Sequence, residues 1–163
     1  MTPIEHDIRY SELEDLHSLK EWFAEPAAAD PFPFGFAEKE DALSNWIGFS
    51  KYQASLTAVI GGQPVAVGTL FLMPYRKVSH HASFYLIVAP AYRRQGIGTS
   101  MVRNLMHLAK SRFRLEVLHG ELFEPSPLEA LLERLSFTLF ARQENYVHLD
   151  AGPRARRIYG RFL

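Results

Sequence analysis

The most chemically suggestive stretch of the sequence is a basic, glycine-rich turn between an apolar strand and an amphipathic helix. The turn follows the apolar run Leu86–Pro90 and consists of Arg93, Arg94, Gln95, Gly96, Ile97, Gly98 and Thr99. The first N–H groups of a helix lack internal partners and carry partial positive charge. The glycines let an anion approach the backbone, and the arginines add full charges. The pattern therefore predicts a binding site for a ligand that carries a diphosphate.

Two familiar phosphate-binding loops do not match this turn. A P-loop requires Lys followed by Ser or Thr directly after its second glycine, and the sequence contains no such run. A dinucleotide-binding fingerprint requires Gly or Ala three residues after Gly98, where this chain has Met101. The acidic residue expected about twenty positions further on is available as Glu116 or Glu121. The missing small residue and the two arginines ahead of the turn therefore argue against a dinucleotide site.

The turn resembles motif A of the GCN5-related N-acetyltransferase (GNAT) family, whose signature is Arg/Gln-x-x-Gly-x-Gly/Ala. Here Arg93-Arg-Gln-Gly-Ile-Gly98 follows Val88-Ala-Pro90, and the order of elements agrees from about Ser55 to Tyr146. The resemblance implies that residues 93–99 hold the pyrophosphate of acetyl-CoA. It also implies that Ile87 and Val88 pair with the amides of the pantetheine arm, and that the Val88 N–H points at the thioester oxygen.

Apolar periodicity and turn residues predict the elements that must position this turn. We expect strands at 6–10, 55–60, 64–73, 79–89 and 114–123, one or two more within 137–149, and helices at 11–25, 39–51, 96–111 and 126–135. The helix at 96–111 should join its flanking strands as a right-handed crossover, so that they lie parallel. The resemblance implies an α/β acetyltransferase fold: a mixed, mostly antiparallel sheet with a splayed central parallel pair and helices on both faces.

Local signals refine this assignment. Ser11 with Glu14 and Ser126 with Glu129 predict capping boxes, and Gly61-Gly62 indicates a hairpin turn. The first helix should bury its apolar side, which consists of Leu13, Leu16, Leu19 and Phe23.

Length and composition indicate one compact domain over residues 1–163, with a core at about 6–150. Eighteen basic and eighteen acidic side chains cancel, so we expect neither nucleic acid nor a membrane as a partner. The absence of cysteine excludes disulfides, thiolate metal sites and an acyl-cysteine intermediate, and we expect no metal. The sequence has no secretory pattern and no run of about eighteen apolar residues, so we expect a cytoplasmic location.

The segment 151–163 carries four arginines. Such a basic end could contact RNA or the 3′-phosphate of CoA, but we expect a solvated, partly disordered tail.

The family resemblance implies direct attack of an amine on the thioester, which requires a base. Many relatives carry Glu near the start of the strand that leads to the turn, whereas this chain has His80 and His81 there. Histidine titrates in the useful range, although only one of two adjacent strand residues can face a cleft. Glu121 and Glu124, near the end of the partner strand, are rival candidates. All four residues therefore remain candidate bases.

The group that would protonate the leaving thiolate is missing. Aligning Ser136-Phe137 with the family's Gly-Phe pair puts Leu132 where many relatives have a tyrosine. Tyr146 could replace this acid from the last strands. The same alignment puts Ser126 where relatives often contact CoA, although Ser126 is also explained as a helix cap.

The acceptor site is the least determined part. The resemblance places it among the first two helices and the last strands, where Phe32, Phe34 and Trp46 could line it. These aromatic residues could equally cover the core. We predict an acetyl-CoA-dependent N-acetyltransferase that acts on a primary amine of a small molecule or a protein, with a second copy of the chain, in a homodimer, as a candidate partner. The alternative is a non-catalytic, regulatory acyl-CoA-binding domain that has lost its proton-transfer groups.

Overall fold

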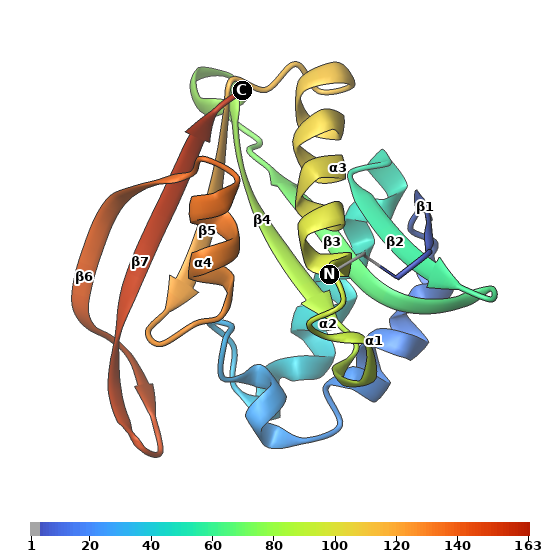
Figure 1. The fold of residues 1–163 in the computed structure, drawn as a ribbon. Helices are drawn as coiled ribbons and strands as arrows, with labels where there is room; N and C mark the ends of the chain where they lie inside the picture. The colour runs from blue at the N-terminus through green and yellow to red at the C-terminus, as the bar shows by residue number, and fades with distance from the viewer. Residues whose placement is uncertain (1–3) are drawn as a thin grey trace.

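Seven strands form one mixed sheet in the computed structural model, which describes residues 4–163 (Figure 1). The spatial order is β1-β2-β3-β4-β5-β7-β6. The strands are β1 (Asp7–Tyr10), β2 (Ser55–Ile60), β3 (Gln63–Leu72), β4 (His81–Val88), β5 (Val117–Phe123), β6 (Thr138–Leu149) and β7 (Gly152–Phe162). Strands β4 and β5 are parallel, and the other neighbouring strands are antiparallel. The predicted mixed sheet with a central parallel pair is confirmed.

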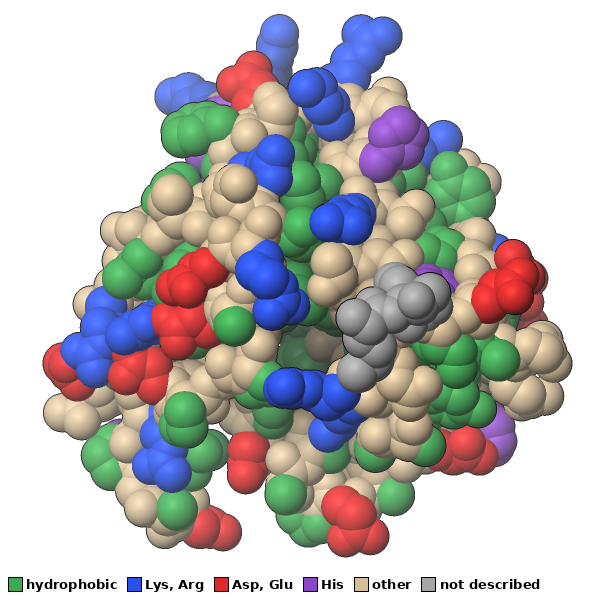
Figure 2. All heavy atoms as spheres, in the orientation of Figure 1, with side chains coloured by type: hydrophobic (Ala, Val, Ile, Leu, Met, Phe, Trp, Pro, Cys, Tyr) green, Lys and Arg blue, Asp and Glu red, His purple; other side chains and the backbone are tan. Residues whose placement is uncertain are grey.

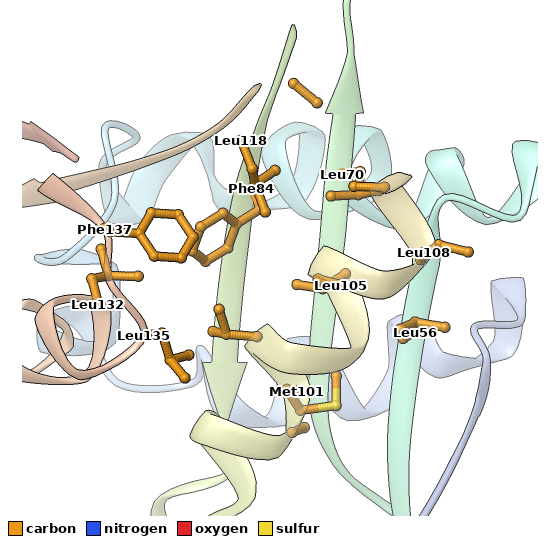
Figure 3. Close-up of a cluster of buried hydrophobic side chains, with 14 of the residues drawn as sticks. Leu56, Leu70, Phe84, Met101, Leu105, Leu108, Leu118, Leu132, Leu135 and Phe137 are labelled. Carbon is orange, nitrogen blue, oxygen red and sulfur yellow. The ribbon is translucent and has the colours of Figure 1, made fainter. Parts of the chain in front are cut away.

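Helices cover both faces of this sheet, as predicted (Figure 1). One face carries α3 (Ile97–Ser111) and α4 (Leu128–Arg134), and the other carries α1 (Leu16–Trp22) and α2 (Lys39–Gly48). Figure 3 shows Met101 and Leu105 of α3 and Leu132 of α4 facing the same cluster of strand side chains. In the part of the chain described here, no helix has the length and hydropathy needed to cross a membrane.

Strand β4 is buried on both sides, as its nearly unbroken apolar sequence predicts. Phe84 packs into the cluster under α3 and α4, while Ile87 packs into the cluster under α1 and α2. Successive side chains of a strand point to opposite faces. The residues Ser83 and Tyr85 therefore lie on the α1/α2 face of β4, together with Ile87.

The first helix begins differently from the prediction. A capping bond is present, but it runs from the Glu12 N–H to Asp15 Oδ2 at 2.9 Å rather than between Ser11 and Glu14. Ser11 is buried and bonds Thr57 at 2.8 Å. Asp15 is fixed in the capping position because Arg9 and Thr57 both donate to it. The segment Leu13–Asp15 forms a 3₁₀ turn ahead of α1, and Leu13 is 48 % exposed instead of buried.

The prediction of a disordered tail at 151–163 is wrong, because this segment forms β7 between β5 and β6. The basic residues that suggested solvation meet acidic partners on neighbouring elements. Arg156 pairs with Glu121 of β5, and Arg157 pairs with Glu124 and with Glu129 of α4. Tyr159 and Gly160 of the same strand are buried. Long-range pairing thus places a locally polar segment inside the sheet.

Candidate functional site

The central parallel pair opens into a gap. Pairing between β4 and β5 covers only His81–Phe84 and Val117–Gly120, although β4 continues to Val88 and β5 to Phe123. Over the same stretch β4 stays paired with β3, and β5 stays paired with β7. We call the space between 85–88 and 121–123 the gap. Figure 1 shows the two strands diverging toward their carboxyl ends, as the predicted splay requires.

Main-chain groups of alternate residues face this gap. The Ala89 N–H donates to the Val65 carbonyl of β3 at 2.8 Å, which fixes the alternation along β4. Ile87 therefore exchanges hydrogen bonds with Val67, while the N–H groups of Leu86 and Val88 point toward the gap. The expectation that Ile87 pairs with the pantetheine arm does not fit this geometry, because β3 already uses its main chain. The main chain of Leu86, by contrast, is not used by β3.

The β5 side of the gap follows the same logic. The Glu124 N–H donates to the Ala155 carbonyl of β7 at 3.0 Å. By alternation, the carbonyls of Glu121 and Phe123 face away from β7 and toward the gap. Both edges of the gap thus offer main-chain groups to an extended ligand.

The predicted anion-binding turn lies at the open end of the gap. Gly96 precedes α3 with φ +84°, and no side chain caps the first N–H groups of the helix. Arg94 also adopts a left-handed conformation, with φ +63°. Arg93 and Arg94 are exposed, and Arg93 Nε donates to the Val88 carbonyl at 3.1 Å. Figure 2, drawn in the orientation of Figure 1, shows a hollow near the centre of the molecule's visible face, with Lys and Arg side chains at the rim of the hollow.

Gly98 has a packing role that the sequence does not reveal. A Cβ at this position would lie 3.3 Å from Leu131 Cδ1 of α4 and 3.8 Å from Leu86 Cδ2. The absence of a side chain therefore lets the first turn of α3 lie close to both β4 and α4. Gln95 and Ile97 hold the turn in different ways: Gln95 Nε2 donates to the Ala91 carbonyl at 3.2 Å on the surface, and Ile97 is buried in the core.

A cavity of about 230 Å³ lies beside the closed end of the gap, on the α1/α2 face. We call it the sheet cavity; it is lined by Ser83, Tyr85, His119, Glu121, Arg156 and Ile158. Glu121 Oε2 accepts a hydrogen bond from Arg156 Nε at 2.5 Å. Burial, followed by the charge of Glu121, raises the pKa of Tyr85 to about 12. The phenol of Tyr85 therefore keeps its proton at neutral pH.

The four candidate bases occupy different surroundings. Glu121 lines the sheet cavity, whereas Glu124 lies outside it and bonds Arg142 and Arg157. The hydrogen bond from Arg142 lowers the pKa of Glu124 to about 2, so this carboxylate has little tendency to accept a proton near neutral pH.

The two histidine candidates lie near the paired ends of β4 and β5. His81 Nδ1 is 2.9 Å from Nε2 of His119 in β5, and the His80 ring lies 4.1 Å from that of His81. Burial, followed by the neighbouring His81, lowers the pKa of His119. Of these three histidines, only His119 lines the sheet cavity.

Three other predicted residues have clear structural surroundings. Ser126 Oγ accepts a hydrogen bond from the Leu128 N–H at 3.2 Å, which confirms the capping interpretation. The predicted box is incomplete, because Glu129 instead accepts a hydrogen bond from the Tyr159 hydroxyl at 2.5 Å. Tyr146 is 47 % exposed, and the Arg156 guanidinium lies 4.6 Å from the centre of its ring.

The predicted aromatic residues form one cluster behind the sheet cavity. The Phe32 ring lies 5.6 Å from both the Phe34 and the Tyr85 rings. Trp46 is 1 % exposed, and its Nε1–H donates to Thr69 Oγ1 at 2.8 Å. Trp46 therefore belongs to the core, and Phe32 reaches the sheet cavity only through Tyr85.

Sequence reasoning missed Ser83, Tyr85, His119 and Arg156. A period-two pattern could have placed His119 with Glu121 on one face of β5. No local pattern indicates Arg156, because only the pairing of β7 with β5 brings it next to Glu121.

Comparisons with known proteins agree with this geometry. Residues 16–137 match the acetyltransferase (GNAT) family. The fold is similar to that of yncA from Salmonella typhimurium, solved with its cofactor acetyl-CoA (TM-score 0.84, 14 % identity, 98 % of this chain and 94 % of that one). It is also similar to an acetyltransferase of the GNAT family from Streptococcus pneumoniae (TM-score 0.79, 17 % identity, 98 % and 100 % covered).

A third similar structure is the ribosomal-protein-alanine N-acetyltransferase from Brucella melitensis (TM-score 0.78, 18 % identity, 96 % and 99 % covered). The sequence has no match among curated proteins. Because the family match extends over most of the chain and the splayed strands meet the glycine-rich turn, the chain belongs to the GNAT family of acetyltransferases.

Proposed function

We propose that this protein transfers the acetyl group of acetyl-CoA to a primary amine of a small molecule or a protein. The observation that carries the proposal is the gap, which ends at the uncapped start of α3. Acetyl-CoA supplies the acyl group as a thioester when it is bound. The chain's residues fit this molecule, because free main-chain groups line the gap and free helix amides and two arginines lie at its mouth.

The turn would hold the diphosphate. The N–H groups of Ile97, Gly98 and Thr99 are the first of α3, and a helix start favours negative charge. Arg93 and Arg94 add charge-assisted hydrogen bonds. Leu86 and Val88 on one side and Glu121 and Phe123 on the other would pair with the pantetheine arm as strands pair with each other.

The position of each amide between the open and closed ends of the gap suggests which one faces the thioester. The arm enters at the α3 end, so the reactive group lies toward the closed end at Phe84 and Gly120. Leu86 is the first gap-facing N–H beyond that end, and Val88 is nearer the mouth. We therefore assign the thioester oxygen to the Leu86 N–H and a pantetheine amide to Val88, which revises the role expected for Val88.

The amine would approach from the sheet cavity, because this cavity flanks the closed end of the gap on the opposite face from α3. Glu121 is the carboxylate that lines this cavity, so it can accept a hydrogen bond from the amine there. The Brucella melitensis relative, which is a ribosomal-protein-alanine N-acetyltransferase, supports an amine as the acceptor.

Two measurements test this function. Acetyl-CoA at a hundred times its Kd should stabilise the chain by about 2.7 kcal/mol in thermal unfolding. ADP, which has a diphosphate but no pantetheine, serves as the control and should stabilise it less. Thiol release in the presence of an amine panel then measures transfer. Absence of any acetyl-CoA-dependent stabilisation would contradict the proposal.

A second candidate, a non-catalytic acyl-CoA-binding domain, is favoured by one observation. Leu132, which stands where many relatives have a proton donor, is fully buried in the core. This alternative predicts the same stabilisation by acetyl-CoA but no thiol release with any amine. The two measurements together therefore separate the candidates.

A further inference from the structure

The sheet cavity contains a complete ion pair. Glu121 and Arg156 are bonded at 2.5 Å, and their side chains are only 15 % and 24 % exposed. Because the two charges cancel, the pair gives little net attraction to a ligand that carries positive charge alone. A ligand with both charges can interact favourably with both partners.

Arg156 is held in place and still has donors to offer. Its Nη1 donates to Gln143 Oε1 at 2.9 Å, and the guanidinium lies over the Tyr146 ring. Within residues 4–163, its Nη2 donates to no protein group. A guanidinium presents its N–H groups as a planar fork that matches a carboxylate. Arg156 is therefore positioned to receive a carboxylate from a ligand.

The remaining walls limit what fits. A cavity of about 230 Å³ is smaller than the about 300–1,000 Å³ typical of drug-sized ligands. Ile158 and the ring of Tyr85 provide apolar surface, and the phenol of Tyr85 and the hydroxyl of Ser83 provide hydrogen-bond donors. The cavity therefore suits a compact molecule with one short apolar side chain.

We infer that the acceptor is a small α-amino acid, bound as a zwitterion with its carboxylate on Arg156 and its ammonium group on Glu121. This inference rests on the proposed acetyl transfer. The two charged groups of an α-amino acid are attached to one carbon, so they can engage two adjacent, oppositely charged side chains at once. The amine nitrogen then lies beside Glu121, whose main chain borders the gap.

In this arrangement Glu121 can accept the proton that the amine must lose before it attacks the thioester. The ammonium group gives one proton to the Glu121 carboxylate, which passes it to solvent after the reaction. The nitrogen forms a bond to the acetyl carbon, and the C–S bond breaks with its electron pair on sulfur. The second proton leaves the nitrogen and ends on that sulfur. The product is an N-acetyl amino acid, which has lost the positive charge that Glu121 attracted and is therefore released more easily.

Matched acceptors test the inference in the unchanged protein. Thiol release with acetyl-CoA is measured for leucine, leucinamide and isoamylamine, and for methionine, methioninamide and 3-(methylthio)propylamine. Each set keeps the side chain and removes only the carboxylate charge or the whole carboxylate. A lost charge-assisted contact should lower kcat/KM by about tenfold to a hundredfold. We expect the free amino acids to be preferred by that factor.

Arg156→Gln tests the assigned partner. The change should lower kcat/KM for the preferred amino acid by a larger factor than kcat/KM for its decarboxylated amine, so that the preference for the amino acid falls by about tenfold to a hundredfold. Arg154→Gln is the matched control, because Arg154 lies on the same strand outside the sheet cavity. Thermal unfolding of each variant shows whether it is folded, and the acceptor comparison in the unchanged protein stands if Arg156→Gln does not fold.

The outcomes separate this inference from the proposed function. If the amides, the decarboxylated amines or peptides with a free N-terminal amine react at least as well as the free amino acids, the zwitterion inference is overturned while acetyl transfer stands. If acetyl-CoA binds but no acceptor of any class releases thiol, the proposed transferase function fails and this inference fails with it. A preference for free amino acids that Arg156→Gln abolishes supports both.

Discussion

Single residues at the site serve two purposes at once. Gly98 lies in the first turn of the helix that would meet the diphosphate, and it also lets α3 approach Leu131 of α4. Arg93 adds charge to the same turn, and it also bonds the Val88 carbonyl at the edge of the gap. Binding and packing therefore constrain the same positions, so a change at the turn has to be compared with a control elsewhere.

The arginines of the turn give the first prediction. Arg93→Ala combined with Arg94→Ala should raise the Kd for acetyl-CoA at least about tenfold, because charge-assisted hydrogen bonds to the diphosphate are lost. Isothermal titration calorimetry measures the change. The control is Arg76→Ala with Lys77→Ala, which removes the same charge from the turn before β4. Equal affinity in the two double variants would show that the diphosphate is bound elsewhere.

Glu124 gives a prediction about pH. The hydrogen bond from Arg142 lowers its pKa from the ordinary 4.5 to about 2. A carboxyl group with a lowered pKa stabilises the fold above its ordinary pKa, and this contribution is lost as pH falls toward the folded value. Between pH 4.5 and 2, the unfolding midpoint of the unchanged protein should therefore fall more steeply than that of Glu124→Gln.

Thermal unfolding across this pH range measures the difference. Because the ion pair lies near the surface, the difference should be small and should shrink at high salt. Identical pH profiles of the two proteins at low salt would contradict the assignment.

At the scale of elements, the direction of each amide along β4 decides what the strand can bind. Because hydrogen-bonding direction alternates along the strand, the main chain of Ile87 bonds β3, and the N–H groups of Leu86 and Val88 face the gap. The side chains alternate in the same way, so that Tyr85 faces the sheet cavity while Phe84 faces α4. One strand thus borders the sites of both substrates in the proposed reaction.

A pair of backbone changes tests this alternation. Replacing the Leu86 N–H by an ester oxygen should lower kcat by about 10²–10³-fold, because one donor to the oxyanion is lost. The same change at Ile87 should instead cost about 0.5–1.5 kcal/mol of stability, because it removes a hydrogen bond of the β3–β4 ladder. Steady-state kinetics and urea unfolding of the two semisynthetic proteins measure these effects. If the ester at Ile87 lowers kcat and the ester at Leu86 lowers stability, then the Ile87 N–H faces the gap and the Leu86 N–H bonds β3, which contradicts the assignment.

At the scale of the whole molecule, β7 completes both the sheet and the site. It lies between β5 and β6, and it brings Arg156 next to Glu121. Its other face connects to α4, because Tyr159 donates to Glu129. The end of the chain is therefore needed to close the sheet cavity.

Truncation tests this role. A chain that ends at Ala151 should lose cooperative unfolding, because β5 loses its antiparallel partner and β6 loses its only described neighbour in the sheet. Circular dichroism during urea unfolding measures this, with removal of Phe162 and Leu163 alone as the milder control. A truncated chain with an unchanged urea midpoint would instead restore the view of this segment as a tail.

The sequence alone was sufficient to predict the glycine-rich turn before α3, the amphipathic pattern of α3 and the parallel pairing of β4 and β5. These features depend on residues that are close together in the chain, such as Arg93, Gly96 and the apolar run before them, and local geometry fixes how such residues lie. The family resemblance then supplied the splay of the parallel pair and the mixed, mostly antiparallel sheet around it.

Only the tertiary structure decided which distant residues share the sheet cavity. Tyr85, Glu121 and Arg156 come from three strands, and their meeting depends on strand order and register, which no local pattern encodes. The same reason explains why the prediction of a disordered tail is wrong, because the partners of Arg156 and Arg157 lie 35 and 33 residues away along the chain. Local residue types thus determined the turn before α3, whereas long-range pairing determined which side chains line the sheet cavity.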